Sequence, residues 1–416
     1  MRALALSLAA ACFFAAPAAA ETVLIQNGRV VTNGDAGVIE NGDVLIVDGR
    51  VRAVGENVAA PNGARVIDAA GKWVTPGVFA AMSEIGLSEI SGSGAPNDAD
   101  LEGDLISAAA DAARAFDPLV TAVAVTRMEG VTRAAIAPSE TATMFSGRGA
   151  LVALGGRPDS VFGPRAFMVL ELGEQGAERT GSSRTALWPA LEAALRDARE
   201  YPGRYRSGQG GAVLDEIDAE ALQPFARGQG LFLVHAESAS DLRELMRFKR
   251  ANPRLRFAVH GGAEAWQVAE ELAAADIPVI VDPLSNLPDR FERLSARLDN
   301  AVLLQAAGVR IAIAPQPGTI DAHQARLSLQ LAGNAVANGL SWEAAFAAIS
   351  SGPADIFGVG RELGQLRAGY RADVVVWDGD PLEVMSAPTA VFIDGVEQPL
   401  VSRQTRLRDR YNPNNR

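Results

Sequence analysis

Short runs of alternating apolar and polar residues lie at both ends of the chain. The N-terminal segments TVLIQNGRVVT and GDVLIVDGRVRAVG carry Asn-Gly at 27–28 and Asp-Gly at 48–49. Such dipeptides within β-prone segments predict hairpins. The C-terminal segments ADVVVWDGDP and PTAVFIDGVEQP have the same character. The pattern predicts one small β-sandwich built from both termini, with residues 21–77 as its first part and residues 365–405 as its second.

Between these ends, apolar strand-like runs alternate with Ala-rich helical stretches. The predicted strands are RAAIAP, AFMVLEL, GLFLVHAE, RFAVHGG, PVIVDP and VRIAIAP, and the predicted helices include TALWPALEAALRDAREY and SASDLRELMRFKRA. Strict alternation over this length is typical of a parallel sheet with helical crossovers, and the length suits a closed barrel. The predicted fold class is therefore α/β, with a (β/α)8 TIM-type barrel at 78–364 beside the β-sandwich and a tail at 406–416.

The first twenty residues have the character of an export signal. A positive charge at Arg2 precedes the apolar residues 3–16, and Ala20 ends a small-residue cleavage site. We therefore predict a signal peptide at 1–20 and a periplasmic or secreted location. Because Cys12 is the only cysteine, cleavage after Ala20 leaves neither disulfides nor thiolate metal ligands.

The net charge of the chain limits the kinds of molecule that it is expected to bind. The formal net charge is −12, whereas nucleic acids and anionic membrane surfaces attract clusters of Lys and Arg. Lysine is scarce, since Lys72 and Lys249 are the only two. We expect a small-molecule substrate or ligand, no nucleic acid, and no membrane association after signal cleavage.

The segments NGRVV, VTPG and LGQLRAGYRADVVVWDGDPLE resemble the amidohydrolase superfamily, in particular its imidazolonepropionase-like bacterial members. The likeness covers nearly the whole chain after the signal, and AFDPLVTAVAVTRMEGVTRAAIAPS resembles the secreted subgroup. The resemblance implies metal-dependent hydrolysis of a non-peptide or dipeptide-like C–N bond. In such sites one or two divalent ions, usually zinc, lower the pKa of a bound water so that hydroxide attacks.

The resemblance also implies ligands at the carboxyl ends of the barrel strands. They are a His-x-His after the first strand, often a carboxylated Lys after the fourth, single His residues after the fifth and sixth, and an Asp after the eighth that serves as base. Where the family has PGLIDAHTH this chain has PGVFAAMSE, so Met82 and Glu84 occupy the His-x-His positions. The fourth-strand position falls on Val169 and the eighth-strand position on Gln316. The resemblance therefore implies a degenerate metal site.

Two ligand positions keep their histidines, His235 in LVHAES and His260 in AVHGG. With Glu84 they could hold one zinc or other divalent ion, since two imidazoles and a carboxylate form a workable ligand set. The alternative is that both are inherited histidines hydrogen-bonded to their neighbours, and that no metal binds. Glu237 is expected on the same strand face as His235. Met82 is expected to be apolar filler.

Two functions stay open. The first is a hydrolase acting on carbon–nitrogen bonds with reduced or altered activity, in which metal-bound hydroxide attacks and Glu84 or Glu237 moves the proton. The second is a catalytically silent barrel, a pseudoenzyme, that binds a small ligand or pairs with an active paralogue. Barrels of the resembling family form dimers, so the resemblance implies a homodimer or a heterodimer with a related amidohydrolase.

Overall fold

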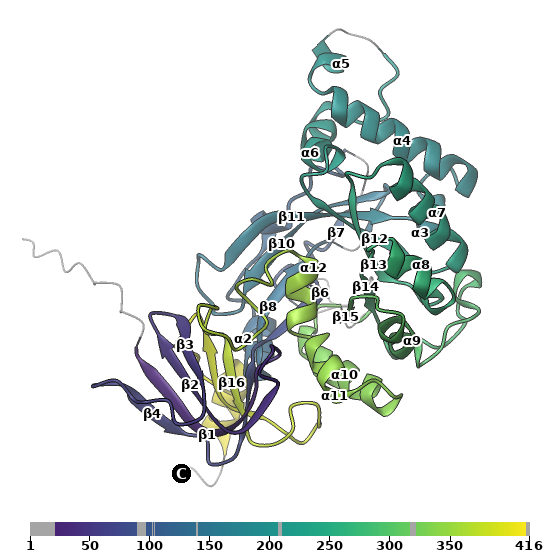
Figure 1. Cartoon of the computed structure of the whole chain (residues 1–416). Helices are drawn as coiled ribbons and strands as arrows, with labels where there is room; N and C mark the ends of the chain where they lie inside the picture. The colour runs from purple at the N-terminus through teal and green to yellow at the C-terminus, as the bar shows by residue number, and fades with distance from the viewer. Residues whose placement is uncertain are drawn as a thin grey trace, which may run out of the picture.

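The computed structural model describes residues 21–89, 97–101, 103, 105–138, 140–206, 210–316 and 322–412. The predicted signal peptide at 1–20 lies outside these residues. A barrel with surrounding helices and a separate β-sheet make up the described chain (Figure 1). Within the described ranges, no helix combines the length and apolar character needed to cross a membrane.

Eight strands form the barrel sheet, in the order β15-β14-β13-β12-β11-β10-β8-β6. They are β6 (Val78–Ser83), β8 (Val131–Ile136), β10 (Phe145–Ala153), β11 (Val161–Glu171), β12 (Leu231–Ala236), β13 (Arg256–Gly261), β14 (Val279–Val281) and β15 (Ile311–Ile313). Strands β6, β8 and β12 are buried at every position, and β6 and β12 are accordingly mainly apolar. Segment 348–349 bridges the two ends of the sheet, because Phe79 N donates to Ile349 O (2.8 Å) and Ile313 N donates to Ala348 O (2.9 Å).

Helices surround the barrel on the side of β12 to β15 (Figure 1). Helix α4 shows why the sequence forms them: Ser183 caps its first turn through Thr185 N, and residues at helical spacing, such as Leu187 and Leu191, are buried on one face. The helices are α1 (Ala112–Ala115), α2 (Thr121–Met128), α3 (Gly173–Glu178), α4 (Arg184–Glu200), α5 (Gly203–Arg206), α6 (Glu216–Ala226), α7 (Ala239–Ala251), α8 (Ala269–Ala274), α9 (Asn300–Ala306), α10 (Ser328–Ala337), α11 (Trp342–Ala347) and α12 (Ser351–Ile356).

Strand β10 departs from the regular parallel barrel that the sequence predicts. It is antiparallel to both β8 and β11, whereas the other neighbouring strands of this sheet run parallel. Antiparallel neighbours need no crossover helix, and the described residues of segments 137–144 and 154–160 contain none. The close fit of the strands requires Gly149, because a Cβ there would lie 2.1 Å from the Phe167 ring.

The second sheet combines both ends of the described chain, as predicted. Its order is β18-β17-β16-β5-β1-β2-β3, with β4 also paired to β1, and it contributes to a separate apolar core. The strands are β1 (Val23–Val31), β2 (Val38–Val47), β3 (Arg50–Gly55), β4 (Arg65–Asp68), β5 (Trp73–Pro76), β16 (Val374–Trp377), β17 (Pro388–Ile393) and β18 (Val396–Glu397). The sequence predicts that the second part of the β-sandwich ends, and the C-terminal tail begins, at 405/406. In the structure this position falls inside helix α13 (Arg403–Tyr411).

A buried ion pair joins the barrel to this sheet. Arg133 of β8 is 1% exposed, and its Nε and Nη2 lie 2.6 and 2.9 Å from the two carboxylate oxygens of Asp373, which precedes β16. Its Nη2 also lies 2.8 Å from Asp394 Oδ1. Burial alone would lower the pKa of Arg133, but the two carboxylates raise it. The guanidinium is therefore a permanent charge shared by both bodies.

We expect the substitution Arg133→Met to lower the free energy of unfolding by about 3–5 kcal/mol, because it leaves the Asp373 carboxylate buried without its cation. Urea unfolding of the purified protein measures this loss. Arg247→Gln is the matched control, since Arg247 pairs with Glu244 at the surface and should change stability little. Equal losses in the two variants would contradict the prediction.

Candidate functional site at the carboxyl end of the barrel

Three ionisable side chains lie level with one another on three adjacent strands. Glu171 at the end of β11 is in register with His235 of β12, which is in register with His260 of β13. Each is buried. Because these strands run parallel, their carboxyl ends meet at one mouth of the barrel. The structure thus brings the two predicted histidines together and adds Glu171, which the sequence did not single out.

The resemblance implies that Val169 occupies the fourth-strand ligand position. In the structure, the residue of β11 level with His235 is Glu171. Val169 is paired with Leu233, two residues before His235. It belongs to the apolar cluster inside the barrel. One signal could have identified Glu171, because it is the only charged residue of the apolar run AFMVLEL.

The ring of His235 lies between two carboxylates. Its Nδ1 is 2.8 Å from Glu171 Oε2 and its Nε2 is 3.3 Å from Glu237 Oε1. Burial alone would lower the pKa of His235, but the negative charges of Glu171 and Glu237 outweigh it and raise the pKa to about 10. The ring is therefore an imidazolium at neutral pH and donates one proton to each carboxylate.

Glu237 contacts His235 and is held from its other side by the loop after β13. Its Oε2 accepts a hydrogen bond from Ala263 N (2.8 Å). Gly261 has φ +107°, and a Cβ there would lie 2.9 Å from Glu237 Oε1, so a glycine is needed for the backbone to pass the carboxylate. Burial acts to raise the pKa of Glu237, but the hydrogen bond and positive charge of His235 lower it. Glu237 is therefore ionised at neutral pH.

His260 has the opposite charge state from His235. Its Nε2 lies 3.0 Å from the carbonyl oxygen of Pro315, and since a carbonyl can only accept, Nε2 carries the proton. Burial and the nearby positive charge of His235 lower the pKa of His260 to about 4. The two adjacent histidines are therefore one cation and one neutral ring at pH 7.

The end of β6 carries the residues at the predicted His-x-His positions. Met82 is 6% exposed and packs inside the barrel in the same cluster as Phe79 and Val169. Glu84 is 8% exposed, and its backbone N donates to Ala322 O (2.9 Å). Met82 is thus part of the apolar interior, and the backbone of Glu84 anchors the segment that follows β15.

Asp282 and Gln316 follow β14 and β15 and are joined by a hydrogen bond. Asp282 Oδ2 accepts from Gln316 N (3.3 Å) and its Oδ1 accepts from Leu284 N (2.9 Å). Burial raises the pKa of Asp282 above its ordinary range. Gln316 Nε2 donates to Ser285 Oγ (2.7 Å), so the carboxamide acts as a donor between loops. The sequence did not single out Asp282, although it directly follows the buried run PVIV.

An ionic cluster fastens the loops that follow β11, β12 and β14. Arg184 binds both oxygens of Asp241 at 3.0 Å, and its Nη2 lies 3.2 Å from Glu292 Oε2. Glu292 also accepts a hydrogen bond from Glu174 N (2.8 Å). Because Asp241 and Glu292 are both 5% exposed, these contacts hold the loops in one arrangement around the mouth.

Known proteins share both the sequence pattern and the fold. The model of the family described as "Amidohydrolase family" matches residues 335–397. The chain is 28% identical over 394 residues to "Amidohydrolase tasK" of Hapsidospora irregularis, across 86% of this chain and 40% of that protein. It is 28% identical over 406 residues to "Imidazolonepropionase" of Acidiphilium cryptum (strain JF-5), across 88% of this chain and 94% of that protein. The chain thus spans less than half of the first relative and nearly all of the second.

The crystal structure of an amidohydrolase from Thermotoga maritima MSB8 has the same fold, with a TM-score of 0.80 at 25% identity, across 92% of this chain and all of that one. The chain is similar to amidohydrolases in sequence and in fold. Its predicted fold class, a barrel with a separate sheet from both termini, is confirmed.

Amidohydrolases usually bind a divalent metal, but the described residues at this mouth are not arranged to hold one. Across the described ranges of the chain, no group of three or more His, Cys, Asp or Glu side chains could hold a metal ion. Both ring nitrogens of His235 contact carboxylates, so a metal could bind the ring only by displacing one of these contacts. A metal held by Glu84, His235 and His260 therefore stays a prediction that this geometry does not favour.

The two histidines at the barrel mouth, His235 and His260, are expected to have very different pKa values. The chain holds three histidines, so their ring signals can be assigned by NMR with the variants His235→Gln and His260→Gln. His260 should stay neutral down to about pH 4, and His235 should stay charged up to about pH 10. Titration of both rings near the ordinary value of about 6.5 would contradict the charge states.

The same ion pairs predict how stability varies with pH. Because the folded pKa of His235 is raised, the pairs stabilise the fold fully below the unfolded pKa of about 6.5, and this stability is lost as the pH rises towards about 10. Urea unfolding over this range should show a decline that is smaller in His235→Gln. If the free energy of unfolding fell equally with pH in the unmodified protein and in His235→Gln, the ion pairs of His235 would contribute nothing to stability.

Proposed function

We propose that the barrel mouth binds a small molecule with an amide, cyclic amide or dipeptide-like C–N group, and that hydrolysis by metal-bound hydroxide has been lost. The observation that carries this proposal is the Glu171–His235–Glu237 contact. His235 matches the fifth-strand ligand of the family, yet both of its ring nitrogens donate to carboxylates. The positively charged ring of His235 therefore lies between these two carboxylates, in the role that a metal cation would otherwise have.

The other changed positions support the same proposal. A thioether is a soft, neutral ligand poorly suited to zinc, so Met82 does not replace an imidazole. A carboxamide has no pKa near 7, so Gln316 does not replace the aspartate base. What the mouth keeps is a set of hydrogen-bonding groups, in which Glu237 is an acceptor and His260 is a neutral ring. An amide ligand offers an N–H donor and a carbonyl acceptor to such groups.

A residual C–N hydrolase is the second candidate, favoured by the acid–base groups that remain together. Glu171 and Glu237 lie within hydrogen-bonding distance of His235, and such groups can move protons to and from a substrate. The predicted metal set of Glu84, His235 and His260 belongs to this candidate. For a metal to bind in this way, the His235 ring must lose a proton and its contact with Glu171 or Glu237.

Location and assembly extend the proposal. We infer from residues 1–20 that the protein is exported to the periplasm or secreted, in the manner of the secreted subgroup. A dimer, with a second copy or with an active paralogue, would allow a silent barrel to serve a working enzyme. Purification from the native host followed by mass spectrometry of the intact particle tests both inferences.

Elemental analysis of the purified mature chain, without a histidine tag and after incubation with zinc, separates the two candidates. We expect well under one tightly held ion per chain, because the lone pairs of His235 are engaged, and no turnover of dipeptides, cyclic amides or N-acyl amino acids above that of buffer. The control is Arg247→Gln, a surface substitution that leaves all three histidines in place. An ion per chain that persists in Arg247→Gln, and that is lost with turnover in His235→Ala, would overturn the proposal.

The binding half of the proposal has its own test. A bound ligand stabilises the folded chain, so at least one compound of the same panel should raise the unfolding temperature. Glu237→Gln should reduce that rise, because it changes the acceptor at the mouth, whereas Arg247→Gln at the surface should not. If no compound shifts the unfolding temperature, binding of this class of ligand at the mouth is refuted.

A further inference from the structure

A cavity lies along the outer side of β10 and β11, towards the end of the strands opposite the mouth. It encloses about 740 Å³ between α6, the loop before β12, and strands β10 and β11. Ala166 of β11 and Gly230 before β12 line it, and each lies five residues before Glu171 or His235. At about 3.3 Å per strand residue, that places them about 16 Å from the mouth. Its volume is within the usual range for small-molecule sites.

The reversed strand explains why this space is open. In a regular barrel a crossover helix packs outside each pair of neighbouring strands. Strand β10 is antiparallel to β8 and β11, and no helix lies in the described residues that connect them. The short helix α1 contacts the outer side of β10 and β11, and α6 forms the opposite wall of the cavity.

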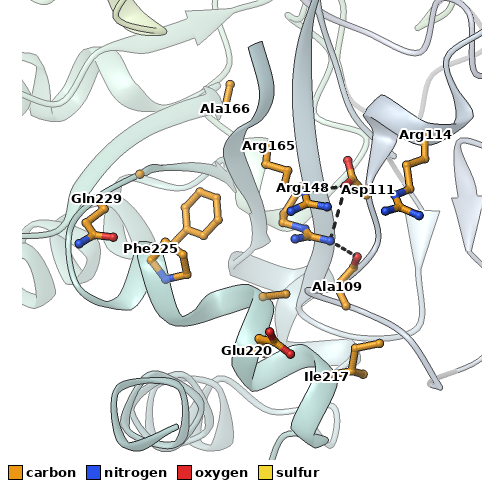
Figure 2. A pocket seen from close by; sticks show the side chains of 13 residues that line it. Ala109, Asp111, Arg114, Arg148, Arg165, Ala166, Ile217, Glu220, Phe225 and Gln229 are labelled. Carbon is orange, nitrogen blue, oxygen red and sulfur yellow. Dashed lines mark hydrogen bonds and ion pairs between the residues drawn. The ribbon is translucent and has the colours of Figure 1, made fainter. Parts of the chain in front are cut away.

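One wall of the cavity is positively charged. Arg148 and Arg165 gather around Asp111, whose Oδ2 accepts a hydrogen bond from Arg165 Nε (2.7 Å) and lies 3.7 Å from Arg148 Nη2 (Figure 2). Arg148 is further held by the carbonyl oxygen of Ala109. Arg114 also lines the cavity, and no described residue forms a hydrogen bond or ion pair with its side chain. Arg148 and Arg165 thus share one carboxylate, and Arg114 adds a third guanidinium to the lining.

The opposite wall is mainly apolar. It is formed by Ile217, Pro224 and Phe225 of α6, and Figure 2 shows Phe225 across the hollow from Arg148 and Arg165. The one acidic side chain on this wall is Glu220. A ligand placed here meets cationic donors on one side and hydrocarbon on the other.

We propose that this cavity binds a small organic carboxylate with an apolar body. The carboxylate is bound by Arg114 together with the free donors of Arg165, because a guanidinium fork matches the two oxygens of a carboxylate. The apolar body packs against Ile217 and Phe225. The site is separate from the mouth and does not depend on the function proposed there.

Isothermal titration calorimetry with benzoate tests the proposal on the full mature chain. We expect saturable binding at one site, and an affinity at least about tenfold weaker in Arg114→Gln, which removes a charge-assisted contact. The uncharged analogue benzamide should bind much more weakly than benzoate. Inorganic phosphate should also bind more weakly, because it has no apolar body.

Arg196→Gln is the matched control, since Arg196 is an exposed arginine of α4 outside the cavity lining; it should bind benzoate as the unmodified chain does. Ile217→Ser should weaken benzoate and leave acetate unaffected. Three results would overturn the proposal: no binding of benzoate, equal binding of benzoate and benzamide, or full affinity in Arg114→Gln with its fold intact by circular dichroism. Phosphate binding tighter than benzoate would overturn the organic class of the ligand.

Discussion

A buried guanidinium needs a carboxylate beside it. In this protein, that requirement links the barrel to the terminal sheet. Arg133 is inside the molecule and binds Asp373 with both arms of its fork. The carbonyl oxygen of Asp373 also accepts a hydrogen bond from Gly77 N (3.0 Å), directly before β6 begins. The contacts of Asp373 thus tie the start of the first barrel strand to the buried ion pair.

The same need for neutralisation shapes the mouth. Glu171 and Glu237 are 1% and 3% exposed, and two carboxylates this deeply buried are costly without a nearby positive charge. His235 supplies that charge by keeping a second proton. Its charge in turn favours the neutral form of His260. The proton that His235 keeps therefore affects both its own contacts and the charge state of the neighbouring histidine.

The fold followed from the sequence wherever burial alone decides the structure. The runs around His235 and His260 are apolar throughout because they are barrel wall, so both the strands and the residues at their ends could be predicted. Strand β10 could not, because the glycines of FSGRG resemble a loop and an apolar pattern does not encode strand direction. Glu171 was missed because register is set by neighbouring strands, and the cavity was missed because Arg114, Arg148 and Phe225 meet only in three dimensions.

The reversal of β10 also has an evolutionary consequence. In an all-parallel barrel, the loops that can lengthen and diversify most freely open at the mouth, where any change disturbs whatever is bound there. Here the hairpin at 154–160, between β10 and β11, turns at the far end instead. Relatives of this protein can therefore vary that turn, by substitution or insertion, without altering Glu171 or His235. One inverted strand gives the lineage a second, independent surface on which selection can act.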